Sequence, residues 1–350
     1  MVEDNFTVIK ANVVDDVNIE FINSTYGNVS INITIPKNFT GKVNLTIDNK
    51  TQEVNIINGQ AVVPVDNITG GSHTFEVTYN GDDNFEPFDK IVNLTVTKDD
   101  IDLCDVGVTV NGTYGNASVI VTVPKGVTGN ITVTVGNETF SAPIVNSTAV
   151  IPLPGVGAGN HIVKIEYIDD DNYNPFNTTE NITIPKAEIN PNKDVDVGVN
   201  GTYGNGTIVI TVPKNMTGNV TIIIGGNVTV NVPIENGTVI INLPEDLPAG
   251  NHTVVIKYPG DENYDPFNVT DINITIPKAD IDPDKDVNVT MLDPSVGNAT
   301  VEISVPKGMT GNITITVNGT DYNATIENGT VVYMRLLQLI QLQVLVWLTM

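Results

Sequence analysis

The 350-residue chain carries 41 acidic and 16 basic side chains, which gives a formal net charge of −25. Such a charge repels nucleic acid and anionic lipid surfaces and attracts cations, so it excludes a nucleic-acid-binding protein. The hydrophobic fraction of 40% is that of a folded protein. The single cysteine, Cys104, excludes a disulfide framework within the monomer.

The chain begins with a segment that resembles the end of a folded unit. Residues 5–11 read NFTVIKA, which matches NITIPKA at 181 and again at 273. The start has neither the basic nor the apolar region of a signal peptide. We therefore expect residues 1–10 to be the end of a preceding repeat, and the chain to be a fragment of a longer protein whose signal stands at its true start.

Two markers recur along the chain with a period close to 90 residues. The first is PKNFTGK at 36, PKGVTGN at 124, PKNMTGN at 213 and PKGMTGN at 306. The second is YNGDDNFEPF at 79–88, YIDDDNYNPF at 167–176 and YPGDENYDPF at 258–267. This period fits a small sandwich domain and is too long for helical solenoid units. It predicts repeats at 11–98, 99–186 and 187–278, and an incomplete fourth repeat at 279–332 followed by a tail at 333–350.

Within each repeat the apolar residues alternate with period two, which indicates half-buried strands. The third repeat shows the pattern in TIVITV (207–212), VTIII (220–224), VTVNV (228–232), TVIINL (238–243), HTVVIKY (252–258) and DINITI (271–276). With an opening strand near 195–199, this gives about seven short strands and no helix. We therefore predict an all-β fold of tandem Ig-like β-sandwich domains, three complete and one truncated.

The segment PAGNHTVVIKYPGDENYDPF, with its two relatives in the earlier repeats, carries a family resemblance. It resembles bacterial Ig-like repeats of the group 3 type and looks most like the adhesin-like surface proteins of methanogenic archaea. The resemblance covers three full copies and most of a fourth. It implies a secreted protein, anchored at the cell surface, that mediates adhesion.

The acidic turn at 258–267 has two readings. Asp261, Glu262 and Asp265 offer the oxygen ligands that calcium prefers, but the spacing does not match an EF-hand loop. The acidic linkers at 99–105 and 279–286 could hold a bridging calcium ion in the same way. The alternative is that these residues form only a solvated turn and linkers. We expect the turn between the last two strands to place its aromatic side chains over the open end of the sandwich.

Other chemically suggestive residues recur in register, which favours structural roles. His73, His161 and His252 occupy the same position in three repeats, so they cannot form one metal site and are expected to be satisfied strand-edge residues. Catalysis needs an asymmetric cluster, and Cys104 shares no motif with a histidine. We therefore expect no enzyme, no catalytic, cofactor-binding or metal residues, and no cofactor. Four recurring lysines could in principle form amide links to Asn, but we expect them to be exposed: Lys37, Lys125, Lys214 and Lys307.

The strongest remaining signal is the glycosylation sequon. Of 45 Asn, 31 begin an Asn-x-Ser/Thr triplet, where Ser and Thr frequencies alone predict roughly six. Part of this excess follows from alternating strands, which place Asn and Thr two apart on the outer face, so that a site such as Asn273 need not be used. Asn200, Asn236 and Asn251 fall at predicted turns from which a glycan could project. Dense glycosylation fits a secreted protein.

The tail at 333–350 breaks the pattern. It contains the only Arg and the only Trp, Arg335 and Trp347, and has no Asn, Gly or acidic residue. A frameshift is the favoured reading, with a membrane anchor or an interaction segment as rivals; Arg335, Gln338, Gln341 and Gln343 interrupt the roughly 18 apolar residues that a membrane span needs. We expect the fourth repeat to lack its last two strands.

Together these patterns predict a non-enzymatic adhesin-like protein on the outside of the cell. Its domains would serve as a stalk and as contact modules for glycans or proteins on other cells. The alternative is a purely structural spacer of the cell envelope with no specific ligand. Membrane contact is expected only if the tail is native.

Overall fold

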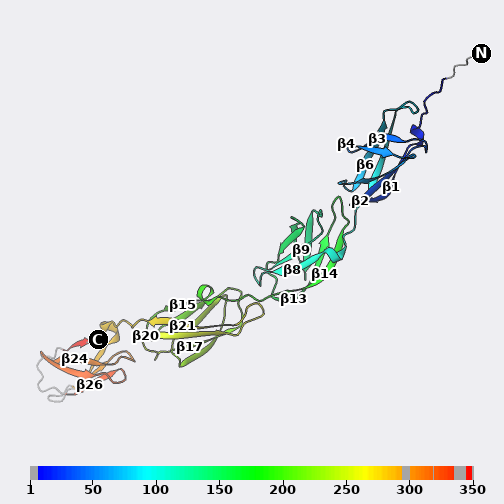
Figure 1. Ribbon diagram of the computed structural model, residues 1–350. Helices are drawn as coiled ribbons and strands as arrows, with labels where there is room; N and C mark the ends of the chain where they lie inside the picture. The colour runs from blue at the N-terminus through cyan, green and yellow to red at the C-terminus, as the bar shows by residue number, and fades with distance from the viewer. Residues whose placement is uncertain (1–6, 294–299, 318, 335–343, 349–350) are drawn as a thin grey trace, which may run out of the picture. The chain divides into compact units, whose positions relative to one another are not determined.

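The computed structural model describes residues 7–293, 300–317, 319–334 and 344–348. The chain forms a series of β-sandwiches, as the alternation predicts (Figure 1). The first contains β1 (Asn18–Thr25), β2 (Asn28–Thr34), β3 (Gly41–Ile47), β4 (Lys50–Ile56), β5 (Gln60–Val65), β6 (Gly71–Tyr79) and β7 (Phe88–Val96). The second contains β8 (Gly107–Asn111), β9 (Ser118–Thr122), β10 (Asn130–Val135), β11 (Glu138–Pro143), β12 (Thr148–Pro152), β13 (Gly159–Tyr167) and β14 (Phe176–Ile184). The third contains β15 (Asp196–Asn200), β16 (Thr207–Thr211), β17 (Asn219–Ile224), β18 (Val228–Pro233), β19 (Thr238–Asn242), β20 (Gly250–Tyr258) and β21 (Phe267–Ile276).

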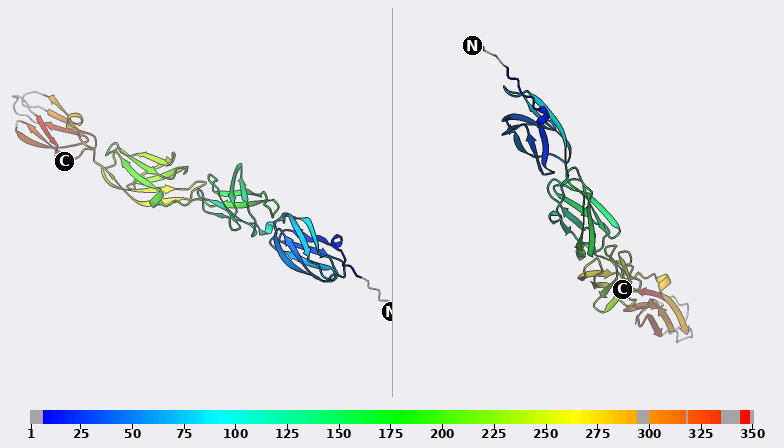
Figure 2. Two further views of the ribbon diagram at one scale, coloured as in Figure 1. Left: turned by 90° about the horizontal axis from the view of Figure 1, so that it is seen from above. Right: turned by 90° about the vertical axis from the view of Figure 1, so that its right-hand side faces the viewer.

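Each of these sandwiches pairs a three-stranded sheet with a four-stranded sheet, and every pairing between named strands is antiparallel. In the first sandwich the orders are β1-β2-β5 and β4-β3-β6-β7. The second and third repeat this topology. The fourth strand joins the sheet of the third strand, whereas in a constant-type Ig sandwich it lies in the sheet of the first. Figure 2 shows the facing sheets from two further directions.

The core lies between the two sheets and is built from every second residue of each strand. In β10, Ile131 and Val133 are fully buried, while Thr132 between them lies on the outer face and is only partly buried. In the paired strand β13, Val163 and Ile165 are fully buried as well. Burying a side chain of this size stabilises the fold by about 1.5–3 kcal/mol relative to leaving it exposed. A disulfide is therefore not needed to hold the sheets together.

The fourth repeat differs from the other three. It contains β22 (Asn288–Asp293), β23 (Thr300–Ser304), β24 (Asn312–Val317), β25 (Thr320–Thr325), β26 (Thr330–Met334) and β27 (Val344–Leu348). The sheets are β22-β23-β26 and β25-β24-β27. The prediction that this repeat lacks its last two strands is therefore wrong for one of them, because tail residues 344–348 pair with β24 where β6, β13 and β20 stand in the other repeats. The apolar, β-branched sequence of this part of the tail suits a strand.

The membrane-anchor and frameshift interpretations of the tail also depended on four polar residues. These lie outside the described residues: Arg335, Gln338, Gln341 and Gln343. Within the described residues, no helix has the length and apolar character that a membrane crossing requires.

The linkers contain short helical turns that the alternation did not predict. They are η1 (Val14–Asp16), η2 (Leu103–Asp105), α1 (Pro191–Asp194) and α2 (Pro283–Asp286). The side chains of Asp102, Asn190 and Asp282 each accept a hydrogen bond from the backbone N–H two residues later. Each is about one helical turn long, and side-chain caps begin η2, α1 and α2, so none of the four leaves an apolar periodicity in the sequence.

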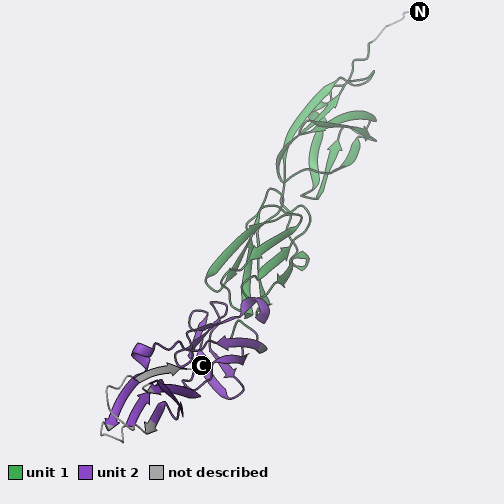
Figure 3. Ribbon diagram, turned by 90° about the vertical axis from the view of Figure 1, so that its left-hand side faces the viewer, with its two compact units in different colours: residues 1–188, 262–264 green, residues 189–261, 265–350 purple. Residues whose placement is uncertain are grey.

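The chain divides into two compact units (Figure 3). The first comprises residues 1–188 and 262–264, and the second comprises residues 189–261 and 265–350. The predicted repeat boundaries at 99, 187 and 279 fall between the last strand of one sandwich and the helical turn of the next linker. Described residues 7–10, expected to match a final strand, form none, because no neighbouring strand pairs with them.

Candidate functional site at the aromatic turns

The aromatic turns connect the last two strands of the first three sandwiches, and an aspartate organises each of the first two. Asp82 Oδ1 accepts hydrogen bonds from the backbone N–H groups of Asn84 (2.7 Å) and Phe85 (2.8 Å). Asp170 Oδ1 accepts the same pair of bonds from Asn172 and Tyr173, both at 2.8 Å. An Asp side chain that binds the backbone of its own turn in this way mimics a backbone turn. These carboxylates therefore shape the loop.

In two repeats the aspartate of the aromatic turn also accepts hydrogen bonds from the Pro-Lys turn of the same sandwich. Asp170 Oδ2 accepts hydrogen bonds from the backbone N–H and the hydroxyl of Thr128, both at 2.8 Å. Asp261 Oδ2 accepts the equivalent bonds from Thr217 at 2.8 and 2.9 Å. The two recurring sequence markers, the Pro-Lys turn and the aromatic turn, thus meet at the same end of the sandwich.

These hydrogen bonds shift the pKa values of the aspartates and of a tyrosine in the aromatic turns. Burial favours the neutral form of Asp170, but the hydrogen bonds from Thr128, Asn172 and Tyr173 outweigh it and hold the pKa of Asp170 below its ordinary value. A hydrogen bond from the Tyr79 hydroxyl, followed by bonds from backbone N–H groups, lowers the pKa of Asp82. Burial and the neighbouring Asp82 raise the pKa of Tyr79 to about 12. The aspartates are therefore ionised and the tyrosine is neutral at pH 7.

Each turn also binds the linker that leads into its own sandwich. Asp99 N–H donates to the Asn172 carbonyl (2.8 Å), and Asn174 N–H donates to the Asp99 carbonyl (2.9 Å). In the first repeat, Ala11 makes the same pair of bonds to Asn84 (2.8 Å) and Glu86 (2.9 Å). The linker thus becomes a short parallel extension of the turn.

Within the first unit, the turn of the second sandwich contacts the first sandwich directly. Tyr26 packs edge-on against Tyr173, with ring centroids 5.3 Å apart at 75°. Asn172 Oδ1 accepts a hydrogen bond of 3.0 Å from the backbone N–H of Gly70. A Cβ at Gly70 would overlap the Asp171 carbonyl oxygen, so the position requires glycine. This junction holds the two sandwiches together through side chains as well as through the linker.

Polar contacts at the linker extend the junction. Lys98 and Asp169 form an ion pair of 2.6 Å, and Asn174 Nδ2 donates to Asp100 Oδ1 at 2.8 Å. Both members of the ion pair are partly exposed, so it adds little stability by itself.

The sequence reasoning missed the tyrosine that makes the junction. Its signal is Thr-Tyr-Gly, which occurs at 25–27, 113–115 and 202–204 with the period of the repeats. In all three copies the tyrosine N–H donates at 2.9 Å to the carbonyl at the start of the following linker, which is Thr97, Pro185 or Pro277. The first unit contains a second ring pair, Tyr114 with Tyr264, whose centroids are 5.4 Å apart at 81°.

The other carboxylates of the aromatic turns include two of the three residues that could offer calcium ligands, Glu262 and Asp265. Asp171 and Glu262 are exposed, and Asp265 is half-buried. In the linkers, Asp102 and Asp282 serve as helix caps, and Asp286 accepts a hydrogen bond from the Asp282 N–H at 2.8 Å. Across the described ranges there is no group of three or more His, Cys, Asp or Glu side chains placed to hold a metal ion. Calcium binding stays an untested alternative to solvated turns and linkers.

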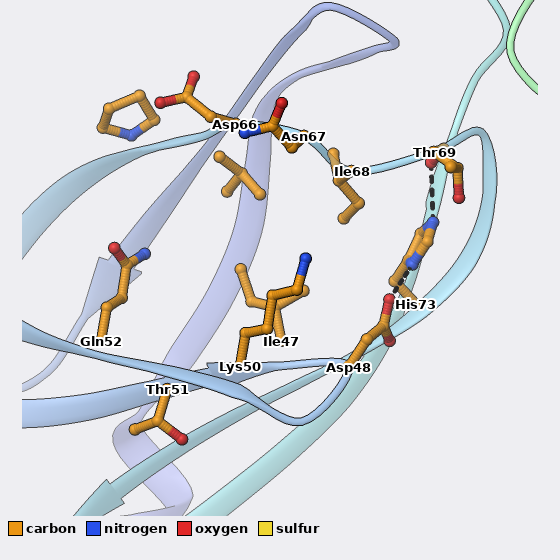
Figure 4. A pocket seen from close by; sticks show the side chains of 12 residues that line it. Ile47, Asp48, Lys50, Thr51, Gln52, Asp66, Asn67, Ile68, Thr69 and His73 are labelled. Carbon is orange, nitrogen blue, oxygen red and sulfur yellow. Dashed lines mark hydrogen bonds and ion pairs between the residues drawn. The ribbon is translucent and has the colours of Figure 1, made fainter.

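The three histidines have the structural role expected of them. Their Nε2 atoms each donate to the backbone carbonyl four residues earlier, at distances of 2.7 to 2.9 Å. His73 alone also binds a carboxylate, that of Asp48, through Nδ1. Figure 4 shows this pair beside a hollow of about 290 Å³ lined by Lys50, Asn67 and Ile68, among others. Asp48 has no counterpart in the second and third repeats, where Gly136 and Gly225 stand in its place.

The other candidate residues are exposed. Cys104 lies at the surface, and hydrogen bonding and charge from Asp102 raise the pKa of its thiol. Such a thiol is a weaker nucleophile at neutral pH than an unperturbed cysteine. The four recurring lysines are exposed too: Lys37, Lys125, Lys214 and Lys307.

Comparisons with known proteins give distant likenesses. No family model matches the chain, and no curated protein matches it significantly. The chain is similar to a solved structure concerned with host cell surface retention of a bacterial ice-binding adhesin, with 14% identity, a TM-score of 0.24, and coverage of 75% of this chain and 99% of that one. It is also similar to the FN1–FN3 domains of chicken CNTN1, with 12% identity, a TM-score of 0.25, and coverage of 76% and 99%. We base the β-sandwich fold on the strands and sheets themselves.

Proposed function

We propose that the chain is a non-enzymatic, adhesin-like repeat protein on the outside of the cell, whose sandwiches act as a stalk and as contact modules. The observation that carries the proposal is the junction in the first unit. There, Tyr26, Gly70 and the 167–176 turn join two successive sandwiches. A chain of domains coupled in this way transmits load and sets the spacing of its contact surfaces, which independent domains on free linkers do not do.

The chemistry of the recurring residues supports the same proposal. The aspartates, histidines and tyrosines that stand in register form hydrogen bonds that hold turns, strands and linkers in place. The motif resemblance to adhesin-like surface proteins points in the same direction. The partners would be glycans or proteins on other cells, and the strongly negative charge favours partners with a cationic surface.

A spacer without a ligand of its own is the second candidate, and the recurrence of the junction residues favours it. The tyrosine-to-linker bond is the same in all three copies, and a bond that fixes the spacing of successive domains needs no ligand.

Binding by the purified full-length chain separates the two candidates. Beads carrying the chain are presented to glycan arrays and to whole cells, with beads carrying an unrelated protein of equal net charge as the control. Specific, saturable binding above the control supports the contact-module function. Binding equal to the control at every chain density would contradict it and leave the spacer.

A further inference from the structure

A hairpin turn with the same backbone recurs in all four repeats and presents an asparagine at its tip. The four asparagines have φ between 50° and 52° and are exposed: Asn58, Asn146, Asn236 and Asn328. In each turn the residue after the asparagine also has positive φ, from 62° to 82°, as in a type I′ turn. The flanking residues close the hairpin by exchanging backbone hydrogen bonds, as Glu235 and Thr238 do at 2.9 and 3.0 Å.

The packing of this turn directs the asparagine toward solvent. In the third repeat, Gly237 is buried, and its carbonyl accepts a hydrogen bond of 2.9 Å from the Val212 N–H. A Cβ on Gly237 would lie 2.7 Å from the Val212 carbonyl oxygen and 2.9 Å from Lys214 Cα. One side of the hairpin is therefore closed against the Pro-Lys turn, and Asn236 stands on the other.

The turn conformation explains the asparagine but not the residue two positions later. Asparagine tolerates positive φ better than most residues, so it suits the tip of a type I′ turn. The third position of the triplet is Thr148, Thr238 or Thr330 in three repeats, which completes a sequon. In the first repeat the same position is Gln60, and the turn keeps its geometry without a sequon. The backbone therefore does not require threonine there.

The sequons are also distributed unevenly over the fold. None of the 28 sequon asparagines in the described residues is buried, and all but Asn23, Asn32 and Asn44 are exposed. By contrast, no sequon lies in the aromatic turns (79–88, 167–176, 258–267) or the linkers (9–17, 97–105, 185–195, 277–287). These segments contain eight asparagines outside any sequon: Asn12, Asn80, Asn84, Asn172, Asn174, Asn190, Asn192 and Asn263. All 31 sequons fall among the other 37 asparagines.

The asparagines without sequons include those whose side chains make contacts at the turns. Asn172 binds Gly70, and Asn174 binds Asp100. Within the first unit, Asn263 Oδ1 also accepts a hydrogen bond of 2.9 Å from the Ala158 N–H. A sugar on any of these amides would occupy the space that the contact needs. The sequence thus places acceptor triplets on the bodies of the sandwiches and omits them from the aromatic turns and the linkers.

We propose that Asn146, Asn236 and Asn328 carry N-linked glycans, and that the aromatic turns and linkers stay free of sugar. The co-reactant is an oligosaccharide activated as a lipid-linked phosphate ester. The asparagine Nδ2 forms a bond to the sugar C1 and loses a proton, while the bond between C1 and the phosphate oxygen breaks and the lipid phosphate leaves. The glycans cover the hairpins beside β12, β19 and β26, which are edge strands, and so hinder pairing with strands of other chains.

This inference rests on the extracellular location in the proposed function. The test uses full-length protein expressed in its native cells and recovered from them, with glycopeptide mass spectrometry before and after chemical removal of sugars. The peptides containing Asn146, Asn236 and Asn328 are expected to carry sugar mass. The peptides containing Asn58 and Asn172 are expected to be bare.

Two variants use the first repeat as a matched control. T238Q copies the first-repeat turn into the third repeat and should abolish the sugar on Asn236 while leaving the sandwich folded. Q60T completes a sequon at Asn58 and should add one glycan there. A bare Asn236 in the wild-type protein, a glycan retained there in T238Q, or sugar on Asn172 would overturn the inference.

Protease treatment of intact cells reports the location independently. If protease removes the protein from the cell surface but the protein carries no sugar, the glycan inference is wrong and the proposed extracellular location is supported. Protein that stays protected inside intact cells would remove the basis of both.

Discussion

Tyr26 in the first sandwich and Tyr173 in the second form an edge-to-face ring pair at the junction between two repeats. Neither ring belongs to the core of the other sandwich, so the contact serves the connection between domains. Aromatic pairs of this geometry contribute about 0.5–1.5 kcal/mol beyond their buried area. Coupling of that size is enough to bias a junction toward one arrangement without making it permanent.

Tyr26→Ala should loosen this junction while both sandwiches stay folded. Ile101 is anchored in the core of the second sandwich, whereas Leu103 two residues later is exposed, so a loosened linker should present Leu103 to a protease more readily. Thermolysin should therefore cleave next to Leu103 several-fold faster in the variant than in the wild type. Tyr26→Phe keeps the ring and serves as the control. Equal cleavage rates for Tyr26→Ala and wild type would show that the ring does not restrain the linker.

Asp170→Asn should destabilise the second sandwich. The amide keeps one acceptor oxygen but replaces the other with a donor, so the paired bonds from Thr128 are lost. Hydrogen bonds to a charged group contribute about 1.5–3 kcal/mol, and we expect a loss in that range in urea unfolding. The matched control is the exposed neighbour, Asp171→Asn, which should change stability by less than about 0.5 kcal/mol. A similar loss in both variants would mean that the Thr128 bonds are not the cause.

Acid should weaken the aromatic turns. The pKa values of Asp82 and Asp170 are lower in the folded protein than the ordinary value of 3.8. Such groups stabilise the fold at pH values above 3.8, and the stabilisation is lost as the pH falls through the folded pKa. The thermal midpoint should therefore fall between pH 5 and pH 2, and it should fall less steeply in Asp170→Asn. An equally steep fall in the variant would assign the acid sensitivity to other carboxylates.

Gly237→Ala should destabilise the third sandwich more than Gly226→Ala does. Both glycines have φ near 75°, at 74° and 77°, where a side chain costs about 1–2 kcal/mol. A Cβ at Gly226 meets nothing within 4 Å, whereas at Gly237 it approaches backbone atoms to 2.7 Å. The difference between the two variants in urea unfolding therefore measures the overlap alone. Equal losses would show that the Pro-Lys turn yields easily.

Local pattern and repetition were sufficient to predict the fold class. Strand alternation is a property of neighbouring residues, so Ile131 and Val133 could be assigned to the core and Thr132 between them to the outer face without coordinates. The recurrence of three histidines also made one shared site impossible, and their common carbonyl bond agrees with that reading. The helical turns of the linkers escaped prediction because side-chain caps on three or four residues leave no period to detect.

The sequence by itself determined that this protein is a tandem array of β-sandwiches with ordered turns, because period-two burial and a repeat of about 90 residues are written in its local order. Only the tertiary structure decided which residues of a neighbouring sandwich the aromatic turn contacts. Asn172 and Gly70 are 102 positions apart, and nothing in either local sequence indicates that they meet. Their contact depends on how two folded sandwiches pack across a linker, and the chain must fold before that surface exists.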